Sequence, residues 1–259
     1  MLALGAGALV VVAACTPAAP AGDAAVPATA KAVPSGITGV LNDEAGSPLA
    51  SAHVLACMST VCYSDRTGAD GRFTFPIDAP AEVVIKTEED IAPGWRRAAA
   101  MAPVRLTEAR LVDVGDVRTP ALPEGPRVGP ARLDPQALDA GDGLSLTVKR
   151  AALKPPAGYA IADVAARRLP AVMLPRYAAL LDEEVVAVYA LHPFAATSAE
   201  PIGIRAASDL PAGTPVKFRT ISEIDGSLSA PVAGTASGSF VATDPSAGIT
   251  RLTYLVVSR

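Results

Sequence analysis

Hydrophobic and polar positions alternate in short runs from residue 36 onward, and turn-forming residues separate these runs. The segment Arg72-Phe73-Thr74-Phe75 has the two-residue period of a half-buried strand. The turn Thr67-Gly68-Ala69-Asp70-Gly71 precedes it. Further strands are expected at 37–42, 52–57, 83–87 and 111–117. Strands at this spacing predict a small β-sandwich over residues 36–118.

A second β-rich region is expected over residues 141–259. Its apolar runs are Leu144–Val148, Val185–Leu191, Ile202–Ile204, Val216–Thr220 and Leu252–Val257. A short helix is expected within 162–181, interrupted by two prolines. Residues 119–140 are rich in proline and predict a linker between the two regions. The predicted fold class is therefore all-β, with two small β-sandwich domains.

The N-terminus differs from the rest of the chain because Leu2–Ala14 is an uncharged apolar run. It is shorter than the roughly 20 residues that a membrane-spanning helix needs, and it fits the apolar region of a secretory signal. No positively charged residue precedes it, which departs from the usual signal. The run ends at Val12-Ala13-Ala14-Cys15, which resembles the bacterial lipobox. The resemblance implies that residues 1–14 are removed and that Cys15 carries a diacylglyceryl group.

Residues 15–35 predict an extended tether, because they consist mainly of Ala, Pro, Thr and Gly. Thr16, directly after the lipobox cysteine, resembles the outer-membrane sorting pattern of Gram-negative lipoproteins. We therefore expect a protein anchored to a membrane outside the cytoplasm through the lipid on Cys15. The bacterial outer membrane is the expected site, with the protein facing the periplasm or the surface.

Composition narrows the function classes. The net charge is −4 without a basic block, which argues against nucleic-acid binding. The chain has three cysteines, and lipidation of Cys15 leaves Cys57 and Cys62 as a pair. Outside the cytoplasm this pair is expected to form a disulfide, with two free thiols as the alternative. A structural zinc site needs four ligands, and His53 alone lies near the cysteines. No metal or cofactor is expected.

The two histidines are expected to have structural roles. His53 alternates with apolar neighbours and is interpreted as a surface or half-buried side chain. His192 precedes a proline at an expected strand end. A Ser–His–Asp triad stays open as an alternative, although no nucleophile-elbow motif supports it. No catalytic residue is therefore predicted.

Acidic clusters and the single tryptophan are the other candidate features. Glu88-Glu89-Asp90 and Asp182-Glu183-Glu184 lack the spacing of a calcium loop, and solvated turns are the favoured interpretation. The same interpretation is favoured for Asp65 and the Asp70-Gly71 pair. Trp95 beside two arginines is a candidate for stacking on a sugar or for filling a core.

The order of motifs in residues 36–118 resembles the carboxypeptidase regulatory-like domain, which has a transthyretin-like sandwich. The matching segments are Gly36–Val40, Gly46–Val54, Thr67–Phe73 and Val112–Val117. The resemblance implies a non-catalytic folding aid, spacer or binding module. Some relatives form Lys–Asn isopeptide bonds, but Lys86 is the only lysine in this region and lies on a late strand, so no such bond is expected.

The last region resembles ZU5-like β-sandwich domains, which usually mediate protein contacts. The segments that carry the resemblance are Leu144–Val148, Glu200–Ile204, Leu210–Gly213 and Glu223–Gly226. The tryptophan that often follows the Asp-Gly pair is replaced by Ser227-Leu228.

These features predict a non-catalytic cell-envelope lipoprotein that acts as a protein-binding or spacer module, with an envelope protein as its partner. One alternative is a carbohydrate-binding module that faces wall or capsule glycan. It expects exposed aromatic side chains lining a groove. Another is a hydrolase with a site at the domain junction, which expects His192 within hydrogen-bond reach of a serine or carboxylate in a cleft.

Overall fold

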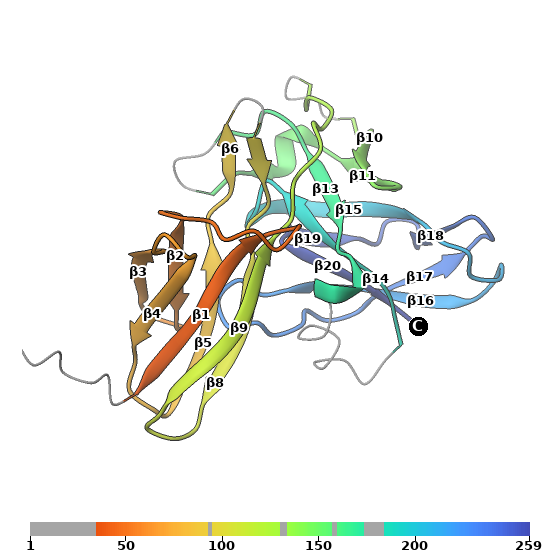
Figure 1. Cartoon of the computed structure of the whole chain (residues 1–259). Coiled ribbons are helices and arrows are strands. Elements are labelled where there is room, and N and C mark those ends of the chain that lie inside the picture. The colour runs from red at the N-terminus through yellow and green to blue at the C-terminus, as the bar shows by residue number, and fades with distance from the viewer. Residues whose placement is uncertain (1–34, 93–94, 130–133, 157–159, 174–183) are drawn as a thin grey trace, which may run out of the picture. The chain divides into compact units, whose positions relative to one another are not determined.

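Every regular element of the described chain is a strand or a short 3₁₀ turn, so the protein is all-β (Figure 1). The computed structural model describes residues 35–92, 95–129, 134–156, 160–173 and 184–259, all within one structural unit. The expected signal and tether lie outside the described residues. Nothing within the described ranges forms a helix of the length and apolarity required to cross a bilayer.

The N-terminal part contains two sheets that pack face to face around an apolar cluster that includes Ile37, Val54 and Phe73. The three-stranded sheet has the order β4-β1-β9, with β1 antiparallel to β4 and parallel to β9. The four-stranded sheet has the order β3-β2-β5-β8. The strands are β1 (Gly36–Asp43), β2 (His53–Cys57), β3 (Cys62–Arg66), β4 (Arg72–Pro76), β5 (Ala81–Thr87), β8 (Met101–Leu106) and β9 (Leu111–Thr119). A separate hairpin joins β6 (Asp90–Ala92) to β7 (Trp95–Arg97).

The sequence pattern explains these strands locally. In β4 the alternate residues Phe73 and Phe75 are buried, while the other three positions are exposed, as the two-residue period predicts. Their ring centroids lie 6.0 Å apart. The expected strands of this region are therefore confirmed, and β6, β7 and β8 are additional strands.

The predicted disulfide between Cys57 and Cys62 is confirmed. The two residues lie directly opposite each other in the β2–β3 hairpin, whose turn is closed by a hydrogen bond from the Met58 amide to the Val61 carbonyl. All five residues of β3 are exposed, and this strand forms the edge of its sheet. The disulfide therefore fixes an edge strand that has little buried surface of its own.

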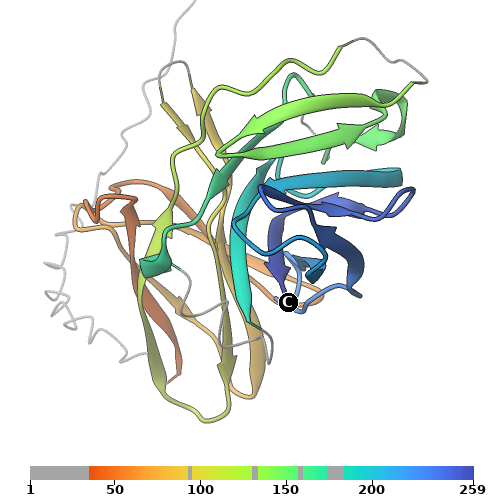
Figure 2. The same cartoon turned by 90° about the vertical axis from the view of Figure 1, so that its right-hand side faces the viewer.

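The C-terminal part contains one large sheet with the order β10-β11-β15-β18-β17-β16-β20-β14-β13, and β12 and β19 also pair with β15 (Figure 2). The Arg168 amide of β13 donates a 2.9 Å hydrogen bond to Asp142, which directly follows β10, so the two ends of the sheet approach each other. The curled sheet encloses a second apolar cluster that includes Leu146, Tyr189 and Phe218. The strands are β10 (Gln136–Gly141), β11 (Leu144–Val148), β12 (Leu153–Lys154), β13 (Ala165–Arg168), β14 (Val185–His192), β15 (Ala196–Ala207), β16 (Pro215–Ile221), β17 (Val232–Ala236), β18 (Phe240–Thr243), β19 (Ile249–Leu252) and β20 (Tyr254–Ser258).

The structure corrects one expectation of secondary structure in this part. The expected helix within 162–181 is wrong for its first half, since Ala165–Arg168 is a strand that pairs with β14 and Ala171–Met173 is a single 3₁₀ turn. Ala165 and Ala166 are both fully buried but pack into different apolar clusters, one on each face of the sheet. A strand buried on both faces lacks the alternation that identifies strands in sequence. Residues 174–183 lie outside the described ranges. Strand β10 also begins within the segment expected to be a linker.

A third apolar cluster, called here the junction cluster, joins the two parts. Its buried members are Val84, Ala98, Met101, Leu122, Ala165, Leu169, Val188, Ala190, Ile221, Tyr254 and Val256. The Tyr254 hydroxyl also donates a 2.8 Å hydrogen bond to the Ala99 carbonyl. The outer face of β13, β14, β16 and β20 is thus covered by the N-terminal part.

The turn that follows β16 packs against the N-terminal sheet at Gly226. This residue has a φ of +71°, and a Cβ added to it would lie 2.6 Å from the Pro103 Cβ on β8. Glycine is therefore required both by the backbone conformation and by the close approach.

Gly226→Ala is expected to destabilise the protein by about 1–3 kcal/mol more than Gly238→Ala, because it adds overpacking to the strain of a positive φ. Gly238 is a matched control, since its φ is +82° and no atom lies within 4 Å of its added Cβ. Urea unfolding of both variants measures the difference. Equal losses of unfolding free energy would contradict the packing of this turn.

Candidate functional site

A cleft of about 290 Å³ opens at one end of the two N-terminal sheets. It is lined by the loop Leu49–Ala52, by the ends of β1, β3, β5 and β9, by the start of β2, and by β7. Loops and strand ends at the edge of a rigid sandwich are common places for binding residues. This cleft is the candidate site because several charged side chains line it.

The loop at the base of the cleft is held in an unusual conformation. Ser51 has a φ of +57°, in the left-handed region that non-glycine residues rarely adopt. Its amide donates to the Thr67 carbonyl at 3.0 Å, and its carbonyl accepts a 2.8 Å hydrogen bond from Arg66. The Thr67 hydroxyl donates to the Leu49 carbonyl and accepts from the Ala52 amide. The end of β3 therefore fixes the loop through both backbone and side-chain bonds.

Four charged side chains and one histidine line the cleft. His53 Nδ1 lies 3.2 Å from a Glu88 carboxylate oxygen, and both side chains are partly exposed. Arg97 lies near Thr119, with two hydrogen bonds of 3.4 Å, and 3.8 Å from the Asp43 carboxylate. The interpretation of His53 as a half-buried side chain is confirmed.

Glu89 connects the cleft to a buried polar network at the junction. Its side chain is only 4% exposed, and one carboxylate oxygen accepts a 2.8 Å hydrogen bond from His192 Nδ1. The other oxygen accepts a 3.0 Å hydrogen bond from the Phe194 amide. The interpretation of the 88–90 triplet as a solvated turn is therefore wrong for Glu89. Its partners are supplied by the end of β14, more than 100 residues away in sequence.

The network continues on the other side of the imidazole. His192 Nε2 lies 3.4 Å from Asp163, whose second carboxylate oxygen accepts hydrogen bonds from Arg96 at 2.8 Å and from the Gly125 amide at 3.3 Å. Glu89 and Arg96 belong to the N-terminal part, and Asp163 and His192 to the C-terminal part. Buried charges are tolerated when they are paired in this way. The network therefore links the two parts through groups that satisfy each other.

The geometry of His192 decides what it can do. It is within hydrogen-bond reach of a carboxylate, as the hydrolase alternative expected, but it is 7% exposed and does not line the cleft. A carboxylate faces each ring nitrogen. A general base needs one nitrogen directed at a substrate or nucleophile proton. The arrangement indicates that His192 has a structural role, in which it joins the two parts by noncovalent polar contacts.

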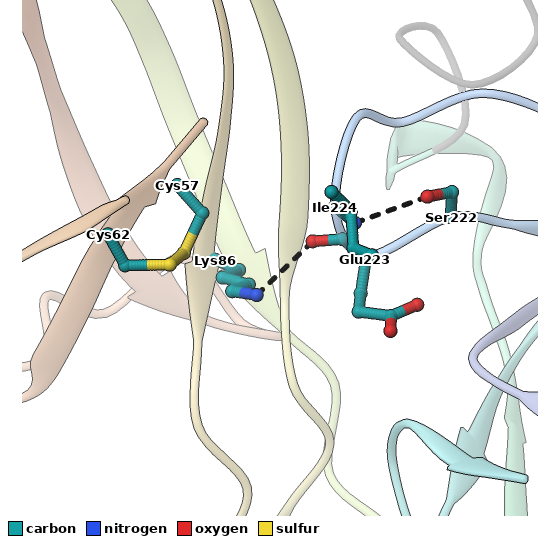
Figure 3. Close-up of a disulfide and its surroundings, with 6 residues drawn as sticks. All are labelled: Cys57, Cys62, Lys86, Ser222, Glu223 and Ile224. Atoms are coloured by element: carbon teal, nitrogen blue, oxygen red, sulfur yellow. Dashed lines mark hydrogen bonds between the residues drawn. A yellow bond between two sulfur atoms is a disulfide. The ribbon is translucent and has the colours of Figure 1, made fainter. Parts of the chain in front are cut away.

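Lys86 lies on the outer face of the four-stranded sheet, near the disulfide (Figure 3). Its ammonium group donates a 3.2 Å hydrogen bond to the Glu223 backbone carbonyl. Burial lowers the pKa of Lys86, and the nearby Glu223 carboxylate opposes this shift. Through this hydrogen bond, Lys86 on β5 connects the N-terminal part to the turn after β16 in the C-terminal part.

The remaining predicted residues are distributed over the surface. Asp70 lies in the expected turn, exposed and 3.4 Å from Arg72. Glu184 is exposed and pairs with Arg259. Cys15, Asp182, Glu183 and the side chain of Trp95 lie outside the described residues. In the described ranges, no group of three or more His, Cys, Asp or Glu side chains has metal-binding geometry.

Comparison with known proteins adds no assignment: no family model and no curated protein matches the chain. The residues that sequence reasoning missed are Glu89, Asp163 and Arg96. No local motif marks them, since their partners come from distant strands.

Replacing His192 with Gln is expected to cost about 3–5 kcal/mol of unfolding free energy, because it removes the imidazole between the buried Glu89 and Asp163 carboxylates and leaves Glu89 with the Phe194 amide. His53→Gln removes the same side chain from a partly exposed pair and is expected to cost no more than about 1 kcal/mol. Chemical denaturation of the two variants gives both values. Similar small losses would show that the junction network is not structurally important.

Proposed function

We propose that the protein is a non-catalytic cell-envelope lipoprotein, anchored through Cys15, that acts as a protein-binding or spacer module. The observation that carries the proposal is the pairing of the cysteines. Of the three in the chain, Cys57 and Cys62 form a disulfide. Disulfides persist mainly in oxidising compartments outside the cytoplasm. Cys15 is then left for other chemistry, directly after an apolar run that resembles a lipoprotein signal.

In this proposal, residues 1–14 are a signal, residues 15–35 are a tether, and two β-sandwich domains span 36–118 and 141–259 around a linker at 119–140. The first domain is proposed to be carboxypeptidase regulatory-like and the second ZU5-like. The junction cluster and the Glu89–His192 bond support a spacer role, because they resist relative movement of the two parts. The site of anchoring is proposed to be the outer membrane.

The cleft supports a binding role more than the two alternatives. A sugar-binding groove usually presents aromatic rings, and none of the described residues that line the cleft is Phe, Tyr or Trp. A hydrolase needs a base directed at a nucleophile, whereas both nitrogens of His192 face carboxylates. A module that binds a partner is therefore the function we favour.

Replacing Cys15 with Ala is expected to move the protein from the detergent phase to the aqueous phase in a Triton X-114 partition, because the lipid is lost. The double replacement Cys57→Ser and Cys62→Ser is the matched control and is expected to stay in the detergent phase. Metabolic labelling with a radioactive fatty acid provides a second readout. A Cys15→Ala protein that still carries label and remains in the detergent phase would refute lipidation at this residue.

A partner is tested by chemical crosslinking in intact cells, followed by solubilisation and purification of the tagged protein. We expect one envelope protein to be enriched with the wild type and depleted with Cys15→Ala, which can no longer reach the membrane. If no envelope protein is enriched above an untagged strain, the partner-binding role is contradicted and the spacer role is favoured.

A further inference from the structure

We propose that a partner protein adds an extended segment with a basic side chain to the free edge of strand β8. This edge lies in a groove, called here the β8 groove, that β8 forms with β5, β9 and the turn after β16. Its volume is about 710 Å³. The proposal rests on the partner-binding role proposed above, and it gives that role a surface separate from the cleft and a kind of ligand.

The edge of β8 has backbone groups that no neighbouring strand uses. Strand β8 ends its sheet, and its ladder within the described residues is with β5. The Ala100 carbonyl, directly before β8, accepts a 3.1 Å hydrogen bond from the Thr87 amide, so Ala100 faces β5. Because backbone groups alternate in direction along a strand, Val104 also faces β5, whereas Pro103 and Arg105 face the free edge. The edge therefore offers the Pro103 carbonyl and both backbone groups of Arg105.

The presence of a proline at this position agrees with a free edge. Proline has no backbone N–H, and within sheets it is found mainly on edge strands, where that donor is not needed. Pro103 pairs with Val84 of β5 in the register, and its carbonyl is directed away from that strand. The edge thus presents more acceptors than donors, which suits a segment that supplies its own N–H groups.

The β8 groove has two different walls. Val83 and Val104 lie opposite each other on β5 and β8, and with Val114 of β9 they bring the apolar core of the sandwich to the groove. On the other face of β8, the turn after β16 contributes Gly226 and Ser227. Since side chains of a strand alternate between faces, an added strand would direct apolar residues at the valines and the residues between them at the turn.

The charged residues of the groove favour a basic ligand. They are Glu82, Asp225 and Arg105, so the lining has one negative charge in excess. Hydrogen bonds from the side chains of Ser222 and Ser227 lower the pKa of Asp225, which is therefore ionised at neutral pH. Asp225 lies on the turn, at the wall that would face the polar side of an added strand. A lysine or arginine on that side of the segment would complement it.

The same features favour a single segment over a second copy of this chain. The edge lies between Val114 of β9 and the turn residues Asp225 to Ser227, so one extended chain can enter the groove more readily than the edge of another sandwich. A second copy would also bring the same excess of negative charge. An extended segment of a partner with one basic side chain meets neither obstacle.

The test is titration of the full chain, in detergent, with the peptide acetyl-Thr-Val-Lys-Val amide, followed by isothermal calorimetry. We expect saturable binding with a dissociation constant on the order of 1 mM, as befits a few backbone hydrogen bonds and a small apolar surface. In the antiparallel register with lysine opposite Pro103, the lysine N–H donates to the Pro103 carbonyl. The same peptide with that nitrogen methylated is expected to bind about tenfold more weakly, because it loses this donor. Replacing the lysine with glutamate is expected to weaken binding about threefold or more.

Two pairs of variants place the peptide in the groove. Asp225→Asn is expected to remove most of the preference for the lysine peptide over the glutamate peptide, because the lining loses its excess charge. Asp70→Asn is the matched control: Asp70 and Asp225 are both exposed and each accepts a hydrogen bond from the amide two residues later, but Asp70 does not line the groove. Arg105→Pro is expected to weaken binding about tenfold, because it removes an edge N–H. Arg105→Gln keeps that N–H and is expected to bind at least as tightly as the wild type.

Equal binding of the methylated and unmethylated peptides would overturn the proposal, as would equal binding of the lysine and glutamate peptides to the wild type. Wild-type affinity in a folded Arg105→Pro variant, with folding checked by thermal unfolding, would overturn it too. If that variant does not fold, the methylated peptide on the wild-type protein still decides. Sedimentation of the protein alone tests the other occupant: a dimer that Arg105→Pro abolishes would show that a second copy pairs with β8, which contradicts the proposal.

These titrations are independent of lipidation and of the capture of a partner in cells. A partner that is enriched in cells while the peptides fail to bind would reject the β8 groove and leave the proposed function in place. Failure of the proposed function is shown instead by the crosslinking experiment described above.

Discussion

Strands β14 and β20 carry apolar side chains on both of their faces, and both faces must be covered. In β14, Tyr189 and Leu191 point into the core of the C-terminal sheet, whereas Val188 and Ala190 point into the junction cluster. In β20, Leu255 is in the core of this sheet and its neighbours on either side are in the junction cluster. Since the C-terminal sheet covers only one face, the N-terminal part supplies the cover for the other. The arrangement of the two parts follows from this burial requirement.

The same burial creates a second requirement for the polar groups at the boundary. Once the apolar cluster excludes water, any charged side chain next to it must find its partner within the protein. Glu89 and Arg96 from one part meet His192 and Asp163 from the other, and each carboxylate also accepts a backbone N–H. The polar network therefore adds a geometric constraint that the apolar cluster alone does not provide. In the observed position of the two parts, Glu89 and Arg96 each have a charged or polar partner from the other part.

The sequence predicts those features of the structure that depend on residues close together in the chain, and it misses those that depend on distant residues. The alternation in Arg72–Pro76 and the turn before it depend on neighbouring residues alone, and the strand was predicted correctly. The Cys57–Cys62 pair is also local, since one hairpin joins it. Strand β13 was missed because its two alanines are buried on opposite faces, which removes the alternation. Glu89 lies in an acidic triplet that predicts solvent exposure, and its partner is distant in the chain. Neither the junction nor the wall of the cleft could therefore be predicted from local patterns.

Glu89 has a further consequence, because it belongs to both the junction and the cleft. Its carboxylate is held by His192 and by the backbone after β14, while the residue also lines the cleft beside Glu88. The two hydrogen bonds, one to each oxygen, fix the orientation of the Glu89 carboxylate at the junction end of the cleft. The junction therefore sets the position of one of the two acidic side chains that line the cleft. Separation of the two parts would release Glu89 and change the charge of the cleft, so the stability of the junction and the chemistry of the cleft are coupled through one side chain.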